Sequence, residues 1–234
     1  MTSPTKCTIG SLFSGIGGLE LGLERAGLGP VVWQCELDPF CRRVLAKHWP
    51  DVERFEDVTR PRRWPNVELI CGGFPCQDVS SAGKRRGLGG ERSGLWYHFA
   101  KVVSQVRPRF VIVENVASGV RAWLPTVRRN LCELGYRTRA FALSAADVGA
   151  PHLRRRVFVV AHADGESEPS QPIDAEVGEP SEVAAHWRKP MPDMVRMVHG
   201  VSRGLDGRRV KALGNSVVPQ CAEAIGRIVK EIAA

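Results

Sequence analysis

The stretch CTIGSLFSGIGGLELGLERA, residues 7–26, places a short apolar run, a glycine-rich turn and a leucine-rich run in direct succession. Cys7–Phe13 predicts a strand, and Gly18–Ala26, rich in leucine and alanine, predicts the helix that follows it. Strand, tight turn and helix together form the first unit of a sheet covered by helices. The stretch therefore predicts an α/β fold.

The same alternation of apolar runs and helical stretches continues along the chain. Further strands are expected at Val31–Glu36, Val67–Cys71, Phe110–Glu114, Tyr136–Leu143 and Val157–Ala161. Further helices are expected at Pro39–His48, Leu95–Val106, Ala122–Leu134 and Gln220–Ile232. Val67–Cys71, Phe110–Glu114 and Val157–Ala161 are compact and β-branched, as buried parallel strands usually are. We expect a doubly wound, mostly parallel sheet of the Rossmann-like type.

The composition is that of a globular protein: 234 residues, 43% apolar and 25% charged, enough for one large domain. No apolar run approaches the ~20 residues that span a bilayer, which excludes a membrane protein. The N-terminus lacks the apolar core of a secretory signal, so we expect a cytoplasmic location. The seven cysteines form no Cys-x-x-Cys pair and the six histidines do not gather near them, so no metal site is predicted.

The net charge of +8 is unevenly distributed along the chain. Asp164–Glu182 holds seven acidic residues and no lysine or arginine, and its scarcity of large apolar residues predicts a flexible linker. Arginines and lysines cluster at 60–63, 84–86, 128–129, 154–156 and 208–211. This basic body suggests a polyanionic partner such as nucleic acid, with a solvated basic surface as the alternative.

Glycines and acidic residues mark the ends of the first predicted strands. The glycines between Ser14 and Gly18 let main-chain amides approach a ligand. Glu36 ends the second strand, where an acid suits hydrogen bonds to ribose hydroxyls, and Asp57 is a candidate to hold an adenine edge. Together they suggest an adenosine-containing cofactor at the carboxyl ends of the strands, with a purely structural turn as the alternative.

Reactive and charged residues follow the later strands. Cys76 comes after a buried strand and the rigid turn at Pro75, so it is a candidate nucleophile, although most single cysteines are inert and buried. Glu114 ends the next strand, where a helix cap or surface group is the alternative. Arg154 and Arg156 alternate before the last strand and are expected to face the same site, with an edge-of-sheet charge as the alternative.

Five short motifs occur along the chain in one particular order. They are Phe13–Gly18 (FSGIGG), Gly73–Gln77 (GFPCQ), Glu114–Val116 (ENV), Arg154–Arg156 (RRR) and Gly214–Val217 (GNSV). In sequence and in order they resemble the motifs of the DNA cytosine-5 methyltransferases. The resemblance covers nearly the whole chain apart from the acidic stretch. It implies the S-adenosylmethionine-dependent class I methyltransferase form of the Rossmann-like sheet.

The resemblance implies methyl transfer from S-adenosylmethionine to C5 of a cytosine in double-stranded DNA. The target base is flipped out of the duplex, because its ring carbons are unreachable while stacked. Cys76 then attacks C6 as a thiolate and makes C5 a carbon nucleophile. Glu114 hydrogen-bonds N3 and the exocyclic amine. Arg156, helped by Arg154, holds the O2 carbonyl.

The resemblance also implies the residues that contact the cofactor and the DNA. The cofactor positions are Phe13, Ser14, Gly15, Ile16, Gly17, Gly18, Glu36, Leu37, Asp57, Val58, Pro75, Leu95, Asn215, Ser216 and Val217. The DNA positions are Gln77, Ser80, Lys84, Arg85, Arg86, Arg188 and Arg203. The loop Ser80–Arg92, rich in glycine and basic residues, resembles the family's mobile lid.

Two departures from the family's pattern stand out. His152 occupies the place of a glutamine, and the region before Gly214 is too short for the usual DNA-reading domain. We therefore expect a much reduced target-recognition region and a short recognition sequence. The expected division is a catalytic domain at 1–163, a linker at 164–186, a recognition segment at 187–209, and a completing C-terminal segment at 210–234.

Two other functions remain open at this stage. One is an RNA (tRNA) cytosine-5 methyltransferase of the same fold, since a basic surface does not distinguish the two nucleic acids. The other is a non-catalytic DNA-binding relative. For the favoured DNA enzyme we expect a monomer that acts in restriction–modification or phage DNA protection, with a cognate restriction endonuclease as a candidate partner.

Overall fold

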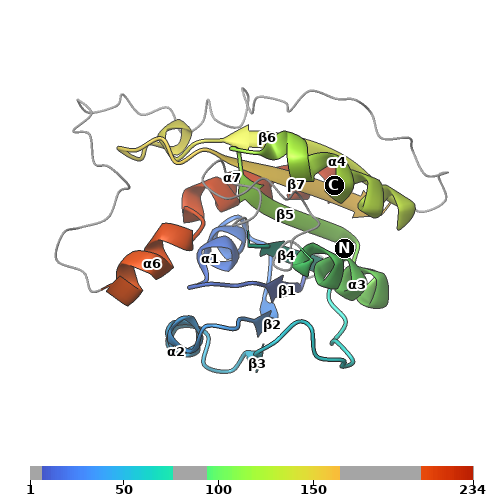
Figure 1. Cartoon of the computed structure of the whole chain (residues 1–234), viewed down its shortest axis with the longest axis horizontal. Helices are drawn as coiled ribbons and strands as arrows, with labels where there is room; N and C mark the ends of the chain where they lie inside the picture. Colours follow the sequence, from blue (N-terminus) through green and yellow to red (C-terminus); the bar gives the residue numbers. More distant parts are fainter. Residues whose placement is uncertain (1–6, 76–93, 164–206, 234) are drawn as a thin grey trace, which may run out of the picture.

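The computed structural model describes residues 7–75, 94–163 and 207–233 (Figure 1). Its strands are β1 (Ile9–Leu12), β2 (Val31–Cys35), β3 (Glu53–Phe55), β4 (Leu69–Gly73), β5 (Phe110–Val116), β6 (Tyr136–Leu143) and β7 (Arg156–Ala163). Its helices are α1 (Gly18–Arg25), α2 (Pro39–His48), α3 (Leu95–Val106), α4 (Val120–Glu133), α6 (Gly207–Asn215) and α7 (Pro219–Ala233), with a short 3₁₀ turn, η2 (Ala146–Val148).

One seven-stranded sheet forms the centre, in the order β3-β2-β1-β4-β5-β7-β6. The strands β3, β2, β1, β4 and β5 run parallel, and β7 pairs antiparallel with both β5 and β6. The predicted α/β class and mostly parallel sheet are therefore confirmed. The parallel direction suggested for Val157–Ala161 is wrong. That run is buried as expected, but burial on both faces does not encode strand direction.

Two elements of the structure have no counterpart in the sequence prediction. The strand β3 has only three residues and lies at the sheet edge, where no apolar run marks it. The helix α6 begins at Gly207, so residues 207–209 of the predicted recognition segment form its first turn. The remaining residues of the predicted linker and recognition segment lie outside the described residues.

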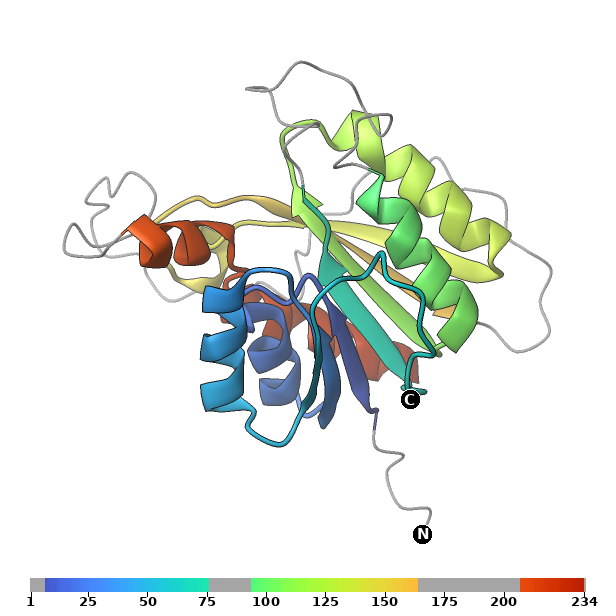
Figure 2. The same ribbon diagram turned by 60° about the horizontal axis from the view of Figure 1, so that its bottom comes forward.

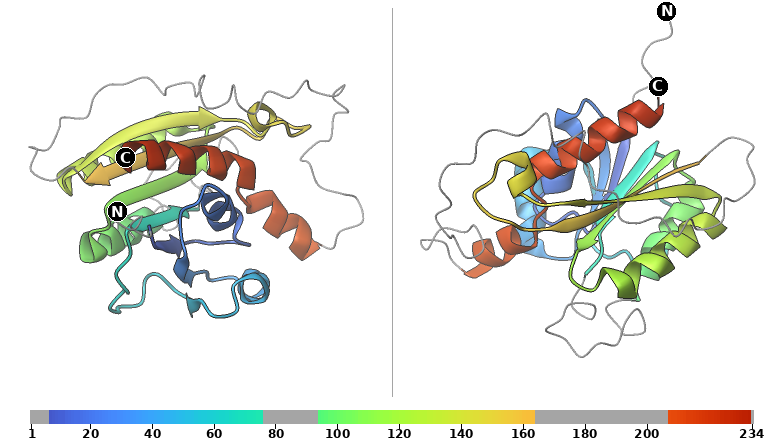
Figure 3. Two further views of the ribbon diagram at one scale, coloured as in Figure 1. Left: turned by 180° about the vertical axis from the view of Figure 1, so that it is seen from behind. Right: turned by 90° about the horizontal axis from the view of Figure 1, so that it is seen from above.

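Helices cover both faces of the sheet. The helices α1 and α7 pack on one face, where Leu23 and Ile225 join the buried Phe158 (Figure 3). The helices α3 and α4 cover the other face, where Trp96 and Trp123 are fully buried. Figures 1 and 2 show α6 on the opposite side of the molecule from α3 and α4. No helix in the described part of the chain is long and apolar enough to cross a membrane.

Local sequence explains where α2 begins. Asp38 has extended backbone angles, and its carboxylate accepts a hydrogen bond from the amide of Phe40 at 2.8 Å. Pro39 follows at the first helical position, where its missing N–H leaves no bond unmade. The helix starts at Pro39, three residues after Glu36, and Glu36 directly follows the last residue of β2.

Candidate active site

The carboxyl ends of β1, β2, β4 and β5 meet at one edge of the sheet, and β7 begins at the same edge because it runs the opposite way. In the register of the strands, Gly73 of β4 lies beside Glu114 of β5. Val116 of β5 lies beside Arg156 of β7. Three of the predicted motifs, far apart in sequence, therefore converge on adjacent strands.

Glu114 and Arg156 form an ion pair at this edge. Arg156 Nε lies 2.9 Å from Glu114 Oε1, and the two side chains are 20% and 10% exposed, respectively. Burial raises the pKa of Glu114 above its ordinary value, and the guanidinium groups of Arg156 and Arg154 act against that rise. The carboxyl group thus combines a tendency to hold a proton with a fixed cationic partner.

The second oxygen of Glu114 faces the main chain of β4. A Cβ atom placed on Gly73 would lie 2.5 Å from Glu114 Oε2, too close for any side chain other than hydrogen. The glycine of the GFPCQ motif is therefore required for the contact between β4 and the carboxylate. This contact lies three residues before Cys76.

The residues that lead to Cys76 are held in the core. Phe74 packs against Trp96 and Trp123, with ring centroids 5.6 and 6.0 Å away. The side-chain amide of Asn115 donates a 3.3 Å hydrogen bond to the carbonyl of Phe74. The Glu-Asn-Val motif thus supplies a carboxyl group to the site and, one residue later, an anchor for the chain that carries the predicted nucleophile.

The glycine-rich turn is attached to the acid that ends β2. Glu36 Oε2 accepts a hydrogen bond from the amide of Gly15 at 2.8 Å, and Oε1 accepts one from Asp38 at 2.8 Å. Phe13 has a left-handed backbone with φ of 54°, an unusual conformation for a residue other than glycine, and its ring stacks on Phe99 at 6.5 Å. Such strain is often found at ligand sites.

A small cavity of about 40 Å³ lies between this turn and the C-terminal segment. Gly73 and Glu114 line it, so it opens beside the ion pair. Of the predicted cofactor positions, the cavity brings together Phe13, Ser14, Gly15, Gly18, Asn215, Ser216 and Val217. The N-terminal and C-terminal motifs are thus parts of one wall.

Other predicted cofactor positions lie outside this cavity. Leu37 is 70% exposed beyond the end of β2, and Val58 packs into the core. Asp57 accepts hydrogen bonds from the amide and hydroxyl of Thr59, which lower the pKa of its carboxyl group. Leu95 begins α3 and packs against the core beside Phe99, while Pro75 is partly exposed.

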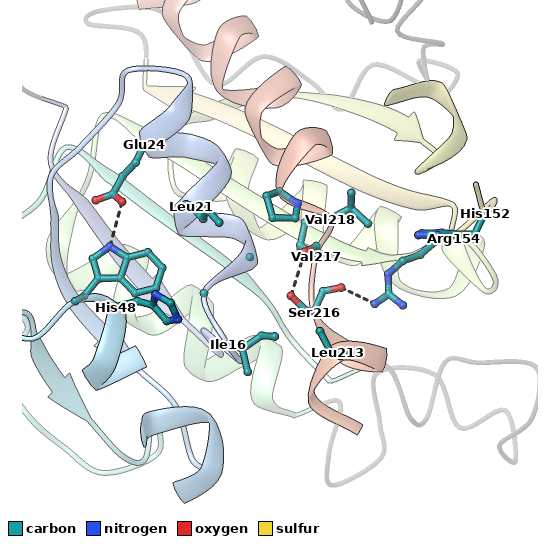
Figure 4. A pocket seen from close by; sticks show the side chains of 14 residues that line it. Ile16, Leu21, Glu24, His48, His152, Arg154, Leu213, Ser216, Val217 and Val218 are labelled. Atoms are coloured by element: carbon teal, nitrogen blue, oxygen red, sulfur yellow. Dashed lines mark hydrogen bonds between the residues drawn. The ribbon is translucent and has the colours of Figure 1, made fainter. Parts of the chain in front are cut away.

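Arg154 has different partners from Arg156. Its Nη2 donates hydrogen bonds to the carbonyls of Gly214 at 2.7 Å and Ser216 at 2.6 Å (Figure 4). Ser216 in turn lies against Gly18, where an added Cβ would come within 2.5 Å of the serine hydroxyl. Arg154 therefore holds the C-terminal motif against the start of α1.

A larger cavity of about 430 Å³ lies on the outer side of α1, between the end of α2 and the segment that joins α6 to α7 (Figure 4). Ile16, Trp49 and Leu213 give it an apolar lining, and Glu24 accepts a 3.1 Å hydrogen bond from the indole of Trp49. His152 also lines it, and burial lowers the pKa of that imidazole. Glu114 and Arg156 do not line this cavity.

The sequence analysis missed one buried acid near the site. Glu20, in the first turn of α1, is fully buried, and burial raises the pKa of its carboxyl group to about 7. Neither carboxylate oxygen has a hydrogen-bond partner among the described residues. An acid in the first turn of a helix is ordinarily a surface residue that complements the helix dipole, so the sequence carried no signal of its burial.

Replacing Glu20 by glutamine is expected to remove a pH-dependent loss of stability. The folded chain binds the Glu20 proton more tightly than the unfolded chain, because the folded pKa is about 7 against an ordinary 4.5. The free energy of unfolding therefore falls as pH rises between these two values, by about 3 kcal/mol in total. Urea unfolding of both proteins should show this advantage for Glu20→Gln at about pH 8 and almost none at about pH 4.5.

Glu114 contributes equally to the pH dependence of the free energy of unfolding in both proteins, so its effect cancels when the two are compared. A stability difference that stays constant across this pH range would show that the pKa of Glu20 is the same in the folded and the unfolded chain.

The remaining predicted site residues lie outside the described part of the chain. They are Cys76, Gln77, Ser80, Lys84, Arg85, Arg86, Arg188 and Arg203. Within residues 7–75, 94–163 and 207–233, no group of three or more histidine, cysteine, aspartate or glutamate side chains could hold a metal ion.

Comparison with known proteins gives consistent matches. A family model described as C-5 cytosine-specific DNA methylase matches residues 7–197. The type II methyltransferase M2.BsuMI of Bacillus subtilis (strain 168) is 38% identical over 162 residues, 64% of this chain and 41% of that protein. M.HgiDI of Herpetosiphon aurantiacus is 37% identical over 164 residues, 66% of this chain and 52% of that protein. The chain spans about half the length of these curated relatives.

Solved structures show the same fold. A putative DNA modification methyltransferase encoded within an E. coli prophage is 26% identical, with a TM-score of 0.57 over 76% of this chain and 54% of that one. The Entamoeba histolytica methyltransferase EhMeth is 12% identical, with a TM-score of 0.70 over 99% of this chain and all of that one. The second likeness concerns the fold alone.

Proposed function

The chain belongs to the C-5 cytosine-specific DNA methylase family, and from this premise we propose that it transfers a methyl group from S-adenosylmethionine to C5 of cytosine in double-stranded DNA. The observation that carries the proposal is the buried Glu114–Arg156 pair. It lies against Gly73, three residues before Cys76, at the mouth of the cavity formed by the glycine-rich turn. A protein that only bound DNA would need none of these groups in contact.

The groups in and beside the small cavity suit part of an adenosine-containing cofactor, which is larger than the 40 Å³ space itself. Gly15 has a positive φ and open space around it, so a ligand can approach its main chain closely. Glu36, fixed by two amide hydrogen bonds, places a carboxylate at the end of β2 for the ribose hydroxyls. Once bound there, S-adenosylmethionine supplies the electrophilic methyl group that C5 takes.

Cys76 is the proposed nucleophile. Its thiolate forms a bond to C6 of a flipped-out cytosine, and the displaced electron pair makes C5 nucleophilic. After C5 is methylated, a base removes the C5 proton; the C5–H electrons restore the ring double bond, and the C6–S electrons return to sulfur. The cysteine is thereby regenerated.

Glu114 and Arg156 are proposed to hold the cytosine and stabilise the charge that forms during the attack. A protonated Glu114 carboxyl group can donate to N3, and burial favours that protonated form. Arg156 uses Nε for Glu114 and Nη1 for the carbonyl of Arg155. We assign its Nη2 to the O2 carbonyl of the base. Both side chains are held before substrate binds, so little reorganisation opposes the reaction.

Arg154 is proposed to act through the cofactor site. Arg154→Ala removes the donors to Gly214 and Ser216, so the C-terminal wall of the cavity should loosen. We expect KM for S-adenosylmethionine to rise about tenfold, with a smaller fall in kcat. Steady-state kinetics with Arg155→Ala as the control tests this. An unchanged KM with a collapse of kcat would instead place Arg154 at the base.

Recognition and biological role are also proposals. Because only 53 residues lie between Val160 and Gly214, we propose a reduced DNA-reading segment within 187–209 and a short recognition sequence. The basic loop at 80–92 is proposed to contact phosphates. The relatives are named type II methyltransferases, which supports a role in restriction–modification or DNA protection. We further propose that the chain acts as a cytoplasmic monomer, with a cognate endonuclease as a candidate partner.

Cytosine-conversion sequencing tests the proposed function. DNA from a methylation-free host that expresses the chain should contain protected cytosines in one short sequence context. Protection confined to tRNA would establish the RNA enzyme instead. Protection of neither nucleic acid, with DNA binding intact, would establish a non-catalytic relative.

A further inference from the structure

Glu20 stands apart from every other acid in the described part of the chain. Its side chain is fully buried, and neither carboxylate oxygen has a hydrogen-bond partner among the described residues. Within the same residues no salt bridge includes it. A buried carboxyl group without a cationic partner destabilises the fold when it ionises, and a cation nearby stabilises the ionised form.

The neighbours of Glu20 place it directly behind the cavity wall. Burial raises the pKa of Glu20, and the hydroxyl dipoles of Ser11, on β1, and Ser14, in the glycine-rich turn, act against that rise together with the main-chain amide of Glu20. Ser14 nevertheless directs its hydrogen bonds to Ser11. Both serines line the small cavity beside Glu114. One layer of side chains therefore separates Glu20 from the cavity.

The other groups around Glu20 supply no positive charge. On β4, burial raises the pKa of the Cys71 thiol, and the Glu20 carboxylate adds to that rise. Beyond β2, the Glu36 carboxylate raises the pKa of Glu20. On α7, which packs against α1, Glu223 and Arg227 pair with each other at 3.0 Å. None of these described neighbours supplies a cation for an ionised Glu20, so a positive charge on a ligand in the cavity would stabilise it.

We propose that Glu20 is a specificity-determining residue that makes the cavity prefer a cationic sulfonium ligand to the neutral thioether left after methyl transfer. The inference rests on the proposed function and extends it, because S-adenosylmethionine carries the positive charge and S-adenosylhomocysteine has lost it. Through the low-dielectric wall, an ionised Glu20 attracts only the first of these ligands. The same interaction favours release of the product after transfer.

The preference depends on pH. Burial raises the pKa of Glu20 to about 7, so the carboxyl group is largely neutral below that pH and largely ionised above it. A bound cation lowers this pKa, and by linkage the cation binds more tightly as pH rises. Ionisation of Glu20 does not strengthen the binding of the neutral thioether.

Isothermal calorimetry with the two ligands tests the inference on the full chain. The measured quantity is the ratio of dissociation constants, S-adenosylhomocysteine over S-adenosylmethionine, at about pH 6 and about pH 8.5. We expect the ratio for the wild type to rise about tenfold across this range. In Glu20→Gln the ratio should rise far less, and whatever rise is left measures the titration of Glu114 and of the ligands themselves. Glu20→Asp should retain part of the rise.

A matched control removes the same charge one turn further along α1. Glu24→Gln keeps an oxygen that can accept from the Trp49 indole, and Glu24 does not line the small cavity. This variant should behave as the wild type. If both ligands bind but the ratio follows the same pH curve in wild type and Glu20→Gln, the role of Glu20 is overturned while the proposed function stands. If neither ligand binds the wild type at either pH, the proposed function fails.

Discussion

Replacing Cys76 by serine is expected to abolish methyl transfer, with a loss of roughly 10⁴-fold or more, because a serine hydroxyl is almost never ionised near neutral pH and attacks C6 poorly. Two readouts report the loss. Cytosine-conversion sequencing should show protected sites for the wild type and none for Cys76→Ser. Duplex DNA that carries 5-fluorocytosine should form a stable adduct with the wild type, since C5 then has no proton to lose.

The control for this experiment is Cys132→Ser. Cys132 is a partly exposed cysteine on α4, the helix that covers the face of the sheet next to the core residues Trp96 and Trp123. This variant should methylate and form adducts as the wild type does. An adduct formed equally well by Cys76→Ser would show that another residue attacks the base.

Replacing Glu114 by glutamine is expected to lower kcat by about 10²- to 10³-fold, with a smaller effect on the affinity for DNA. Glutamine keeps the shape of the side chain but has no carboxyl proton to donate to N3. Before the base binds, it also removes the carboxylate that pairs with Arg156 at 2.9 Å. Single-turnover methylation at saturating DNA measures the chemical step directly.

A double-mutant cycle tests whether Glu114 and Arg156 act as one unit. Arg156→Lys alone should also slow the reaction, because an ammonium group does not reproduce the geometry of the guanidinium. If the two residues hold the base together, the double variant should lose much less than the product of the single losses. If the rate loss of the double variant equals the product of the two single losses, Glu114 and Arg156 act independently.

Glu133→Gln is the matched control for the charge change. Glu133 lies 3.9 Å from Arg129 in an exposed pair on α4, and such pairs contribute little to stability. Its replacement should leave the rate of methyl transfer unchanged.

Local patterns in the sequence determined most of the elements. Pro39–His48, Leu95–Val106 and Tyr136–Leu143 have the predicted bounds in the structure, because capping residues and apolar periodicity act within a few residues of each other. The motifs also indicated which strand ends lie together. That inference works because the carboxyl ends of parallel strands meet at one edge of the sheet.

The partners of individual side chains were decided only by the tertiary structure. Sequence spacing suggested that Arg154 and Arg156 face the same site, yet Arg154 holds the carbonyls of Gly214 and Ser216. Those carbonyls are about sixty residues away, and local pattern carries no information on such contacts. The antiparallel direction of β7 was hidden for the same kind of reason, since a run buried on both faces has the same composition in either direction.

Glu20 shows this division between sequence and structure most clearly. Its sequence context, an acid in the first turn of an amphipathic helix, indicates a solvated surface residue. In the structure, packing of α1 against both the sheet and α7 buries its side chain completely behind the cavity wall. The sequence by itself determined the order of the elements, the family motifs and the sheet edge at which they meet. The tertiary structure alone decided which charges are paired and which buried acid is left without a partner, because burial and pairing depend on segments that only folding brings together.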